Sequence, residues 1–154
     1  MKIYGLLHES HIFLDLKPGD KRQVLGDLVS ALKQRGLISE EGPILDELLK
    51  RESLGSTGLE KGIAIPHALL HGFKEPFLAL SVYKSGIEFE AADSQPTYVL
   101  LLLLGDKKRP GDQLKILAHM CRLVKETDVV EKIRKARNTH EIFEIFKEEE
   151  GKVA

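Results

Sequence analysis

One histidine of this chain stands in a setting that suits reaction with phosphate. His67 closes the segment Gly62–His67 (GIAIPH), and it follows the glycine- and hydroxyl-rich segment Arg51–Gly58 (RESLGSTG). A neutral imidazole has a lone pair and can act as a nucleophile without a separate base. Loop amides, hydroxyl groups and an arginine are the donors that bind phosphoryl oxygens well. The two segments therefore supply an acceptor for a phosphoryl group and the groups that would hold it.

Proline precedes this histidine and restricts its backbone. Pro66 has a fixed φ angle and no amide hydrogen. We expect this rigid stop to place His67 at the end of a short strand, with its side chain projecting from the edge of a sheet. A structural or surface histidine is the alternative, because reactive groups are a minority in proteins. The residue types alone leave both interpretations open.

Three short motifs carry a resemblance to a known family. Arg51–Glu52, Ser56–Gly58 and Gly62–His67 together resemble the signature of the fructose/mannitol-type enzyme IIA domains of the bacterial phosphotransferase system. The similarity is greater to the nitrogen-regulatory IIA proteins, and it extends over nearly the whole chain. It implies a phosphocarrier, and hence a phosphotransferase, in which His67 accepts a phosphoryl group from an HPr-like phosphocarrier protein. The group is then relayed or used as a regulatory signal.

The resemblance also implies roles for individual residues. Arg51 matches an arginine that helps to hold the phosphoryl oxygens, and Ser56 and Thr57 match loop positions beside the phosphate. A second histidine of the family aligns with Gln113, which can donate a hydrogen bond but cannot become cationic. We expect slower transfer, or a phosphorylated state that is stabilised differently. His119 lies on another side of the same expected helix, so we interpret it as structural.

Two alternatives to a phosphocarrier remain open. The first is a regulatory binding module that docks on a transporter or kinase without chemistry, which Gln113 favours and the intact Arg51 and His67 oppose. The second is a hydrolase with His67 as general base, although no carboxylate partner or nucleophile is visible. The resemblance implies no metal and no organic cofactor. It leaves the downstream partner open among a IIB domain, a transporter and a sensor kinase.

The composition limits the other classes of function. The 154 residues include 23 Lys and Arg against 24 Asp and Glu, so no overall charge favours nucleic acid or a membrane as partner. A single cysteine excludes an internal disulfide. No signal peptide or apolar run of membrane-spanning length is recognisable, so we expect a cytoplasmic protein without membrane insertion. Four histidines have no spacing that indicates a metal site: His8, His11, His71 and His140.

Hydrophobic periodicity predicts the elements that position these motifs. Strands are expected at Ile12–Leu16, Ile63–Ile65, Phe77–Tyr83, Ile87–Phe89 and Thr97–Leu104. Helices are expected from Asp20 to Gly36, from about Ser39 to Ser53, at Asp112–Lys125, at Thr127–Ala136 and after Asn138. This order predicts a single three-layer α/β domain over residues 1–154. The resemblance implies a mixed central sheet flanked by helices on both faces.

Three smaller expectations concern the second half of the chain. Apolar residues at helical spacing predict one buried face of the helix Asp112–Lys125: Leu114, Leu117, Cys121 and Val124. The run Glu148–Glu150 is typical of a frayed, solvated end. The charged run Asp106–Gly111 is typical of a solvated loop, and the functional alternative places it at the rim of the His67 site.

Overall fold

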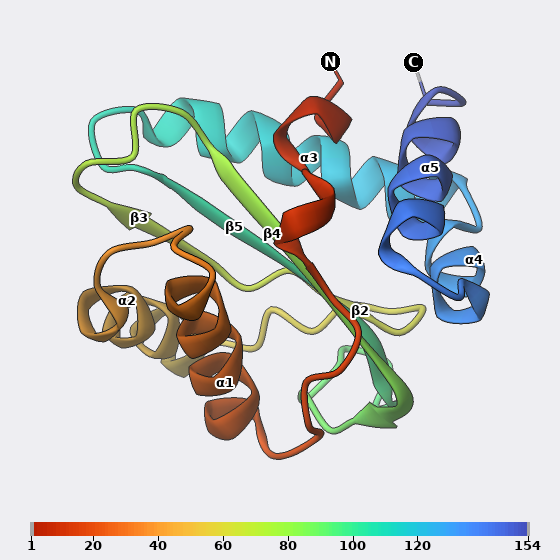
Figure 1. Cartoon of the computed structure of the whole chain (residues 1–154), viewed down its shortest axis with the longest axis horizontal. Coiled ribbons are helices and arrows are strands. Elements are labelled where there is room, and N and C mark those ends of the chain that lie inside the picture. The colour runs from red at the N-terminus through yellow and green to blue at the C-terminus, as the bar shows by residue number, and fades with distance from the viewer. Residues whose placement is uncertain (1, 154) are drawn as a thin grey trace.

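A computed structural model describes residues 2–153 and shows a five-stranded sheet with helices on both faces (Figure 1). The strands are β1 Ile12–Phe13, β2 Ile63–Ala64, β3 His67–Leu70, β4 Phe77–Ile87 and β5 Thr97–Asp106. The helices are α1 Lys21–Gln34, α2 Glu41–Ser53, α3 Pro110–Glu126, α4 Val129–Lys135 and α5 Thr139–Glu150, preceded by short 3-10 turns at Tyr4–Leu6 and Glu9–His11. The predicted three-layer α/β architecture is confirmed.

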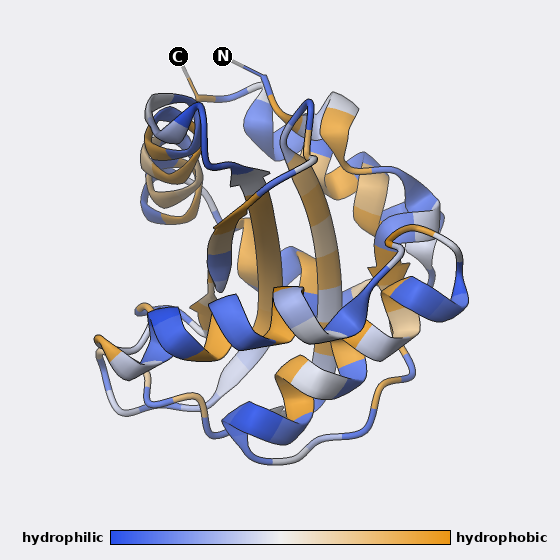
Figure 2. Cartoon of the chain, turned by 90° about the vertical axis from the view of Figure 1, so that its left-hand side faces the viewer, coloured by the Kyte–Doolittle hydropathy of each residue, from blue (hydrophilic) through white to orange (hydrophobic). Residues whose placement is uncertain are grey.

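Strand β5 lies at the centre of a mixed sheet. It pairs antiparallel with β4 on one side and parallel with β2 and β3 on the other, while β1 pairs parallel with β4. Even-numbered leucines such as Leu100 and Leu102 pack in the core beneath α1 and α2, and neighbours such as Leu101 and Leu103 pack beneath α3, α4 and α5. The apolar colouring is concentrated on these strands (Figure 2). The expectation of a strand with two buried faces is confirmed.

Helix α1 begins and ends as its sequence predicts. The Asp20 side chain accepts a hydrogen bond from the backbone N–H of Gln23 at 2.8 Å, which is the expected N-cap. After the helix, Gly36 has a φ of 73°, and Leu37 N donates to Leu32 O at 2.9 Å. This 6→1 hydrogen bond with a left-handed glycine is a Schellman ending. The chain therefore turns sharply toward α2.

The largest differences in strand length from the prediction are in β1 and β4. The first strand is confined to β1, because Leu14 and Leu16 are only partly buried and pair with no strand of the described sheet. The two segments expected at Phe77–Tyr83 and Ile87–Phe89 join in β4. The register with β5 shifts between Val82 and Ile87, where Gly86 has a φ of 81°. Such an irregularity bends a strand without ending it.

The buried face of α3 differs from the prediction. Leu114 and Cys121 are exposed, so the interpretation of Cys121 as a core residue is wrong. The face toward the sheet is instead Gln113, Ile116, His119, Met120, Leu123 and Val124. Both sets of residues recur at helical spacing. The buried set contains the polar residues Gln113 and His119, so hydrophobicity alone does not identify it. Tertiary contacts with β5 decide which face is buried.

Two of the three residues of the acidic end, Glu149 and Glu150, are buried and only Glu148 is exposed, which corrects the expectation of a frayed, solvated end. The Glu150 side chain is fully buried and accepts hydrogen bonds from Ile3 N at 2.5 Å, Tyr4 N at 2.8 Å and His119 Nε2 at 2.7 Å. It joins α3, α5 and the N-terminal segment. The N-terminal segment and the end of α5 lie side by side (Figure 1). The structural interpretation of His119 is thereby supported.

The Glu150 contacts predict a large loss of stability upon truncation. Glu150→Ala leaves two backbone donors and His119 without their acceptor, so we expect the free energy of unfolding to fall by about 3 kcal/mol. Urea denaturation monitored by circular dichroism measures this change. The exposed neighbour Glu148 is the matched control, and Glu148→Ala should change stability by less than about 0.5 kcal/mol. Equal effects of the two substitutions would contradict the role of Glu150.

Candidate functional site

His67 lies on the outer side of the sheet, where β2 and β3 follow one another along β5. The register is continuous, with Ala64 opposite Leu100 and His67 opposite Leu103. Pro66 interrupts the ladder because it has no N–H, although its carbonyl still accepts from Leu103 N at 3.0 Å. His67 thus begins a strand rather than ending one. The proline separates the two strands and leaves the imidazole at the sheet edge beside α2.

Two hydrogen bonds define the state of the His67 ring. Nδ1 lies 2.8 Å from the carbonyl oxygen of Ile65, which can only accept, so Nδ1 carries the ring proton. Nε2 therefore keeps its lone pair, and it accepts a hydrogen bond from Arg51 Nε at 3.3 Å. The unprotonated Nε2 is therefore the ring atom that has a lone pair for a nucleophilic attack.

The surroundings of His67 favour the neutral ring. Burial lowers the pKa of His67 below its ordinary value, and the positive charge of Arg51 lowers it further. The hydrogen bond to the Ile65 carbonyl and the charge of Glu52 act in the opposite direction. The imidazole is consequently available as a nucleophile at neutral pH.

Arg51 connects the histidine to the loop that follows α2. Its Nε donates to His67 Nε2, and its Nη1 donates to Gly55 O at 2.8 Å. A guanidinium group has five N–H donors in a planar fork that matches phosphoryl oxygens. Arg51 therefore stands where an anionic group on Nε2 would be placed.

A groove of about 400 Å³ runs over β3 between the end of α2 and the start of α3. His67, Arg51 and Gln113 all line it, so the structure brings together three of the five predicted site residues. Leu54 and Leu114 stand at its margins and are 81% and 67% exposed. Exposed apolar side chains around a polar centre are typical of a protein-binding surface.

Gln113 is buried beside this groove with one polar atom unpaired. It is 7% exposed, and its Oε1 has no hydrogen-bond partner among residues 2–153. A Cβ atom at Gly105 of β5 would collide with Oε1, so the glycine makes room for the amide. A buried amide without a partner is unfavourable by about 1–3 kcal/mol. Because Oε1 is an acceptor that faces Gly105, it is not the atom of Gln113 that could bind a phosphoryl oxygen.

Ser56 and Thr57 are placed differently from the other predicted residues. Ser56 Oγ donates to Phe89 O at 2.7 Å, and Thr57 Oγ1 donates to the carboxylate of Glu52. Neither residue is among the described residues that line the groove. Their hydroxyl groups hold the loop in place, and a direct contact with a phosphoryl group stays a prediction.

The sequence analysis assigned no role to two charged residues of this region, Glu52 and Lys21. Glu52 is only 8% exposed and accepts hydrogen bonds from Thr57 and from Lys21 Nζ, the latter at 2.9 Å. Glu52 belongs to a recognised motif, but its burial depends on Lys21 of α1, which is 31 residues away along the chain.

The charged segment Asp106–Gly111 after β5 contributes one residue to the groove. Pro110 lines the groove, whereas Lys107–Arg109 are exposed.

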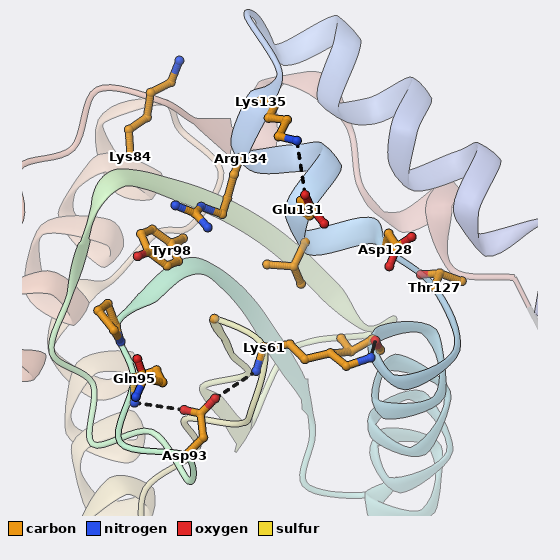
Figure 3. A pocket seen from close by; sticks show the side chains of 14 residues that line it. Lys61, Lys84, Asp93, Gln95, Tyr98, Thr127, Asp128, Glu131, Arg134 and Lys135 are labelled. Atoms are coloured by element: carbon orange, nitrogen blue, oxygen red, sulfur yellow. Dashed lines mark hydrogen bonds and ion pairs between the residues drawn. The ribbon is translucent and has the colours of Figure 1, made fainter.

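A second cavity, of about 550 Å³, lies at the other end of β5 (Figure 3). Its described lining includes Lys61, Tyr98 and Arg134, and the Arg134 guanidinium lies over the Tyr98 ring at 3.3 Å. Tyr98 is near the start of β5, whereas His67 pairs with Leu103 toward its end. Five residues of strand correspond to roughly 16 Å. The cavity is therefore separate from the histidine site.

No group of three or more His, Cys, Asp or Glu side chains within residues 2–153 is arranged to hold a metal ion. None of the helices in the same range combines the length and the apolar character that crossing a membrane requires.

Comparison with known proteins gives a consistent set of similarities. Residues 5–149 match the family described as phosphoenolpyruvate-dependent sugar phosphotransferase system, EIIA 2. A nitrogen regulatory protein of Bradyrhizobium diazoefficiens is 34% identical over 147 residues, which are 95% of this chain and 95% of that protein. The fructose-specific EIIABC component of Bacillus subtilis is 27% identical over 146 residues, which are 95% of this chain but 23% of that protein. The crystal structure of the nitrogen regulatory protein IIA-Ntr from Neisseria meningitidis has a TM-score of 0.83 at 28% identity, covering 94% of this chain and 98% of that one.

The electrostatics of the site predict how His67 titrates. We expect a pKa below the usual value of about 6.5, because burial and Arg51 both disfavour the imidazolium. Arg51→Ala should raise this pKa, since it removes a positive charge beside the ring. An NMR pH titration of the ring resonances measures both values. Arg51→Lys keeps the charge and should keep the pKa low; an unchanged or lower pKa in Arg51→Ala would contradict the assignment.

Proposed function

Since this chain belongs to the EIIA 2 family of the phosphoenolpyruvate-dependent sugar phosphotransferase system, we propose that His67 is the residue on which it carries a phosphoryl group. The chain is a phosphocarrier of that system. The single observation that supports His67 is its ring geometry. Nδ1–H is bound to the Ile65 carbonyl, while the lone pair of Nε2 faces the Arg51 guanidinium.

The proposed reaction needs no proton transfer at His67. Nε2 attacks the phosphorus atom of a phosphohistidine on an HPr-like donor, so a new N–P bond forms as the donor's N–P bond breaks. The electron pair of the broken bond returns to the imidazole of the donor, and the proton of His67 stays on Nδ1, bound to Ile65 O. Loose transition states of this kind are stabilised mainly by positioning and by positive charge.

Arg51 supplies that positive charge. In the resting structure it donates to the same nitrogen that the phosphorus must approach. When the phosphoryl group arrives, the guanidinium turns from Nε2 to the phosphoryl oxygens and keeps its position through Gly55 O. The reaction makes this chain a phosphotransferase in which the protein is first acceptor and then donor.

The groove supports docking of a partner protein over His67. Leu54 and Leu114 are exposed on its two sides, one at the end of α2 and the other in α3. Their burial by an HPr-like donor would exclude water from the reacting atoms. A IIB domain is a candidate for the next acceptor, because the Bacillus subtilis relative is an EIIABC component.

We infer a regulatory role for the phosphorylated state. The similarity to a nitrogen regulatory protein extends over 95% of both chains. A transporter or a sensor kinase would then read whether His67 carries phosphate. The alternative, a module that docks without chemistry, draws support from Gln113 alone, and the ring geometry of His67 opposes it.

Labelling tests the position of the phosphoryl group. The purified protein should gain one acid-labile, base-stable phosphoryl group from a phosphorylated HPr-type donor, because phosphohistidine has this stability pattern, and His67→Ala should abolish it. Intact-mass spectrometry measures the gain. His71→Ala, an exposed histidine just beyond β3, is the control and should be labelled normally. A labelled His67→Ala protein would place the nucleophile elsewhere.

The residue at position 113 should control how transfer depends on pH. A histidine there becomes cationic below a pKa of about 6.5 and would bind a phosphoryl dianion more strongly than a neutral amide. Gln113→His should therefore transfer faster as the pH falls through neutrality, whereas the natural protein should show a flatter profile. Rapid-quench transfer between about pH 6 and pH 8.5 compares the two. Gln113→Leu is the control without a polar group; identical profiles for Gln and His would mean that residue 113 does not reach the phosphoryl group.

A further inference from the structure

We propose that Glu52 is a positioning residue for His67, which acts through the loop after α2 to fix the tautomer and orientation of the imidazole. The inference rests on the proposed function of His67 and deepens it. Glu52 is the residue next to Arg51, and its side chain is almost entirely buried, whereas the Arg51 side chain reaches the groove. A buried carboxylate requires several hydrogen-bond partners. One of these partners, Thr57, is connected to His67 through hydrogen bonds of Ile65.

The Glu52 carboxylate binds both the backbone and the side chain of Thr57. Its Oε1 accepts from Thr57 N at 3.0 Å, and its Oε2 accepts from Thr57 Oγ1. Thr57 is itself buried, so these hydrogen bonds are shielded from water. Charge-assisted hydrogen bonds of this kind are about twice as strong as neutral ones. The carboxylate therefore fixes the middle of the loop to the end of α2.

From Thr57 the contacts continue to the histidine through the main chain. The Thr57 carbonyl accepts from Ile65 N at 3.1 Å. The Ile65 carbonyl, on the other side of the same residue, accepts from His67 Nδ1 at 2.8 Å. Ile65 is thus held on its N–H side by Thr57 and binds the imidazole with its C=O side. Displacement of Thr57 would move the acceptor that keeps the proton on Nδ1.

Lys21 neutralises the buried carboxylate from the first turn of α1. Its Nζ donates to Glu52 Oε1 at 2.9 Å, to Ser56 Oγ at 3.1 Å and to Glu90 Oε2 at 2.7 Å. The Glu52 side chain is only 4% exposed, whereas that of Glu90 is 71% exposed. The inner ion pair is therefore shielded from water, and the outer one is screened by it. Lys21 thus binds one buried and one exposed carboxylate, so substitutions of Glu52 and Glu90 can be compared directly.

Arg51 and Glu52 hold the loop from two sides. Arg51 Nη1 binds the Gly55 carbonyl, and Glu52 binds the amide and hydroxyl of Thr57. Because both residues belong to the last turn of α2, the loop, the arginine and the histidine are positioned as one unit. Loss of Glu52 should release the Ile65 carbonyl and let the ring proton populate both nitrogens. A ring protonated on Nε2 has no lone pair on that nitrogen, so Nε2 cannot attack phosphorus.

The test measures the tautomer and the transfer rate separately. Nitrogen-15 chemical shifts of the unphosphorylated His67 ring should show a single Nδ1–H tautomer in the natural protein and a mixture of tautomers in Glu52→Ala. Single-turnover transfer from a phosphorylated HPr-type donor should show a maximal rate at least about tenfold lower in Glu52→Ala. The half-saturating donor concentration should stay within about twofold, since the docking groove is unchanged. Thr57→Val, which loses only the hydroxyl contact, should shift both readouts in the same direction by less.

Glu90→Gln is the matched control, because it removes the negative charge of the exposed contact of Lys21 and leaves the buried ion pair. It should keep the natural tautomer and rate. A single Nδ1–H tautomer and a natural rate in folded Glu52→Ala would overturn the proposal, as would an equal loss in Glu90→Gln. If Glu52→Ala does not fold, Thr57→Val decides: unchanged tautomer and rate there would equally overturn it.

Failure of the proposed function can be told apart from failure of this inference. The tautomer is measured without any donor, so it reports on Glu52 even if phosphate is carried elsewhere. Labelling of His67→Ala would reject His67 as the acceptor and leave the tautomer result unaffected. Conversely, a normal tautomer in Glu52→Ala and Thr57→Val would reject the positioning role while His67 remains the labelled residue.

Discussion

The pairing of β5 with strands on both sides is the constraint on which the rest of the structure depends. Its side chains are buried on both faces, so each face of the sheet must be covered by helices. Helices α1 and α2 cover one face, and α3, α4 and α5 cover the other. The edge formed by β2 and β3 lies between these layers, and the groove with His67 opens there. Arg51 reaches it from one layer and Gln113 from the other.

The mixed sheet also explains why the site is small and polar at its centre. The parallel pairing of β3 with β5 continues the register of β2, and Pro66 interrupts the ladder at a single residue. The N–H and C=O of Ile65 point away from β5, the first to Thr57 O and the second to the His67 ring. The outward-facing carbonyl of this edge binds Nδ1, and Nε2 then faces Arg51. The chemistry of the ring follows from the geometry of the sheet edge.

Two buried carboxylates join parts of the chain that are distant in sequence. Glu150 binds the N-terminal segment and His119, whereas Glu52 binds Lys21 and Thr57. Each is satisfied by several donors, as a buried charge requires. The first stabilises the fold where the N-terminal segment contacts the end of α5. The second lies beneath the loop of the histidine site and couples it to α1.

The sequence alone determined the features that depend on local chemistry. The Asp20 cap, the Gly36 ending and the apolar run of β5 were all predictable, because each reflects backbone geometry or burial within a short segment. The family followed from three motifs within 17 residues, Arg51 to His67. The three-layer architecture followed from the order of the elements.

Only the tertiary structure decided which side chains face inward and which meet. Helix α3 has two candidate apolar faces at the same spacing, and contact with β5 selected the one that contains Gln113 and His119. The burial of Glu150 and Glu52 was not visible either, because the cationic partner Lys21 of Glu52 and the partners His119 and Ile3 of Glu150 are 31 residues or more away in the sequence. The tautomer of His67 depends on a main-chain carbonyl, which no residue type specifies. Local patterns predict elements, whereas long-range contacts between elements decide burial and the state of the site.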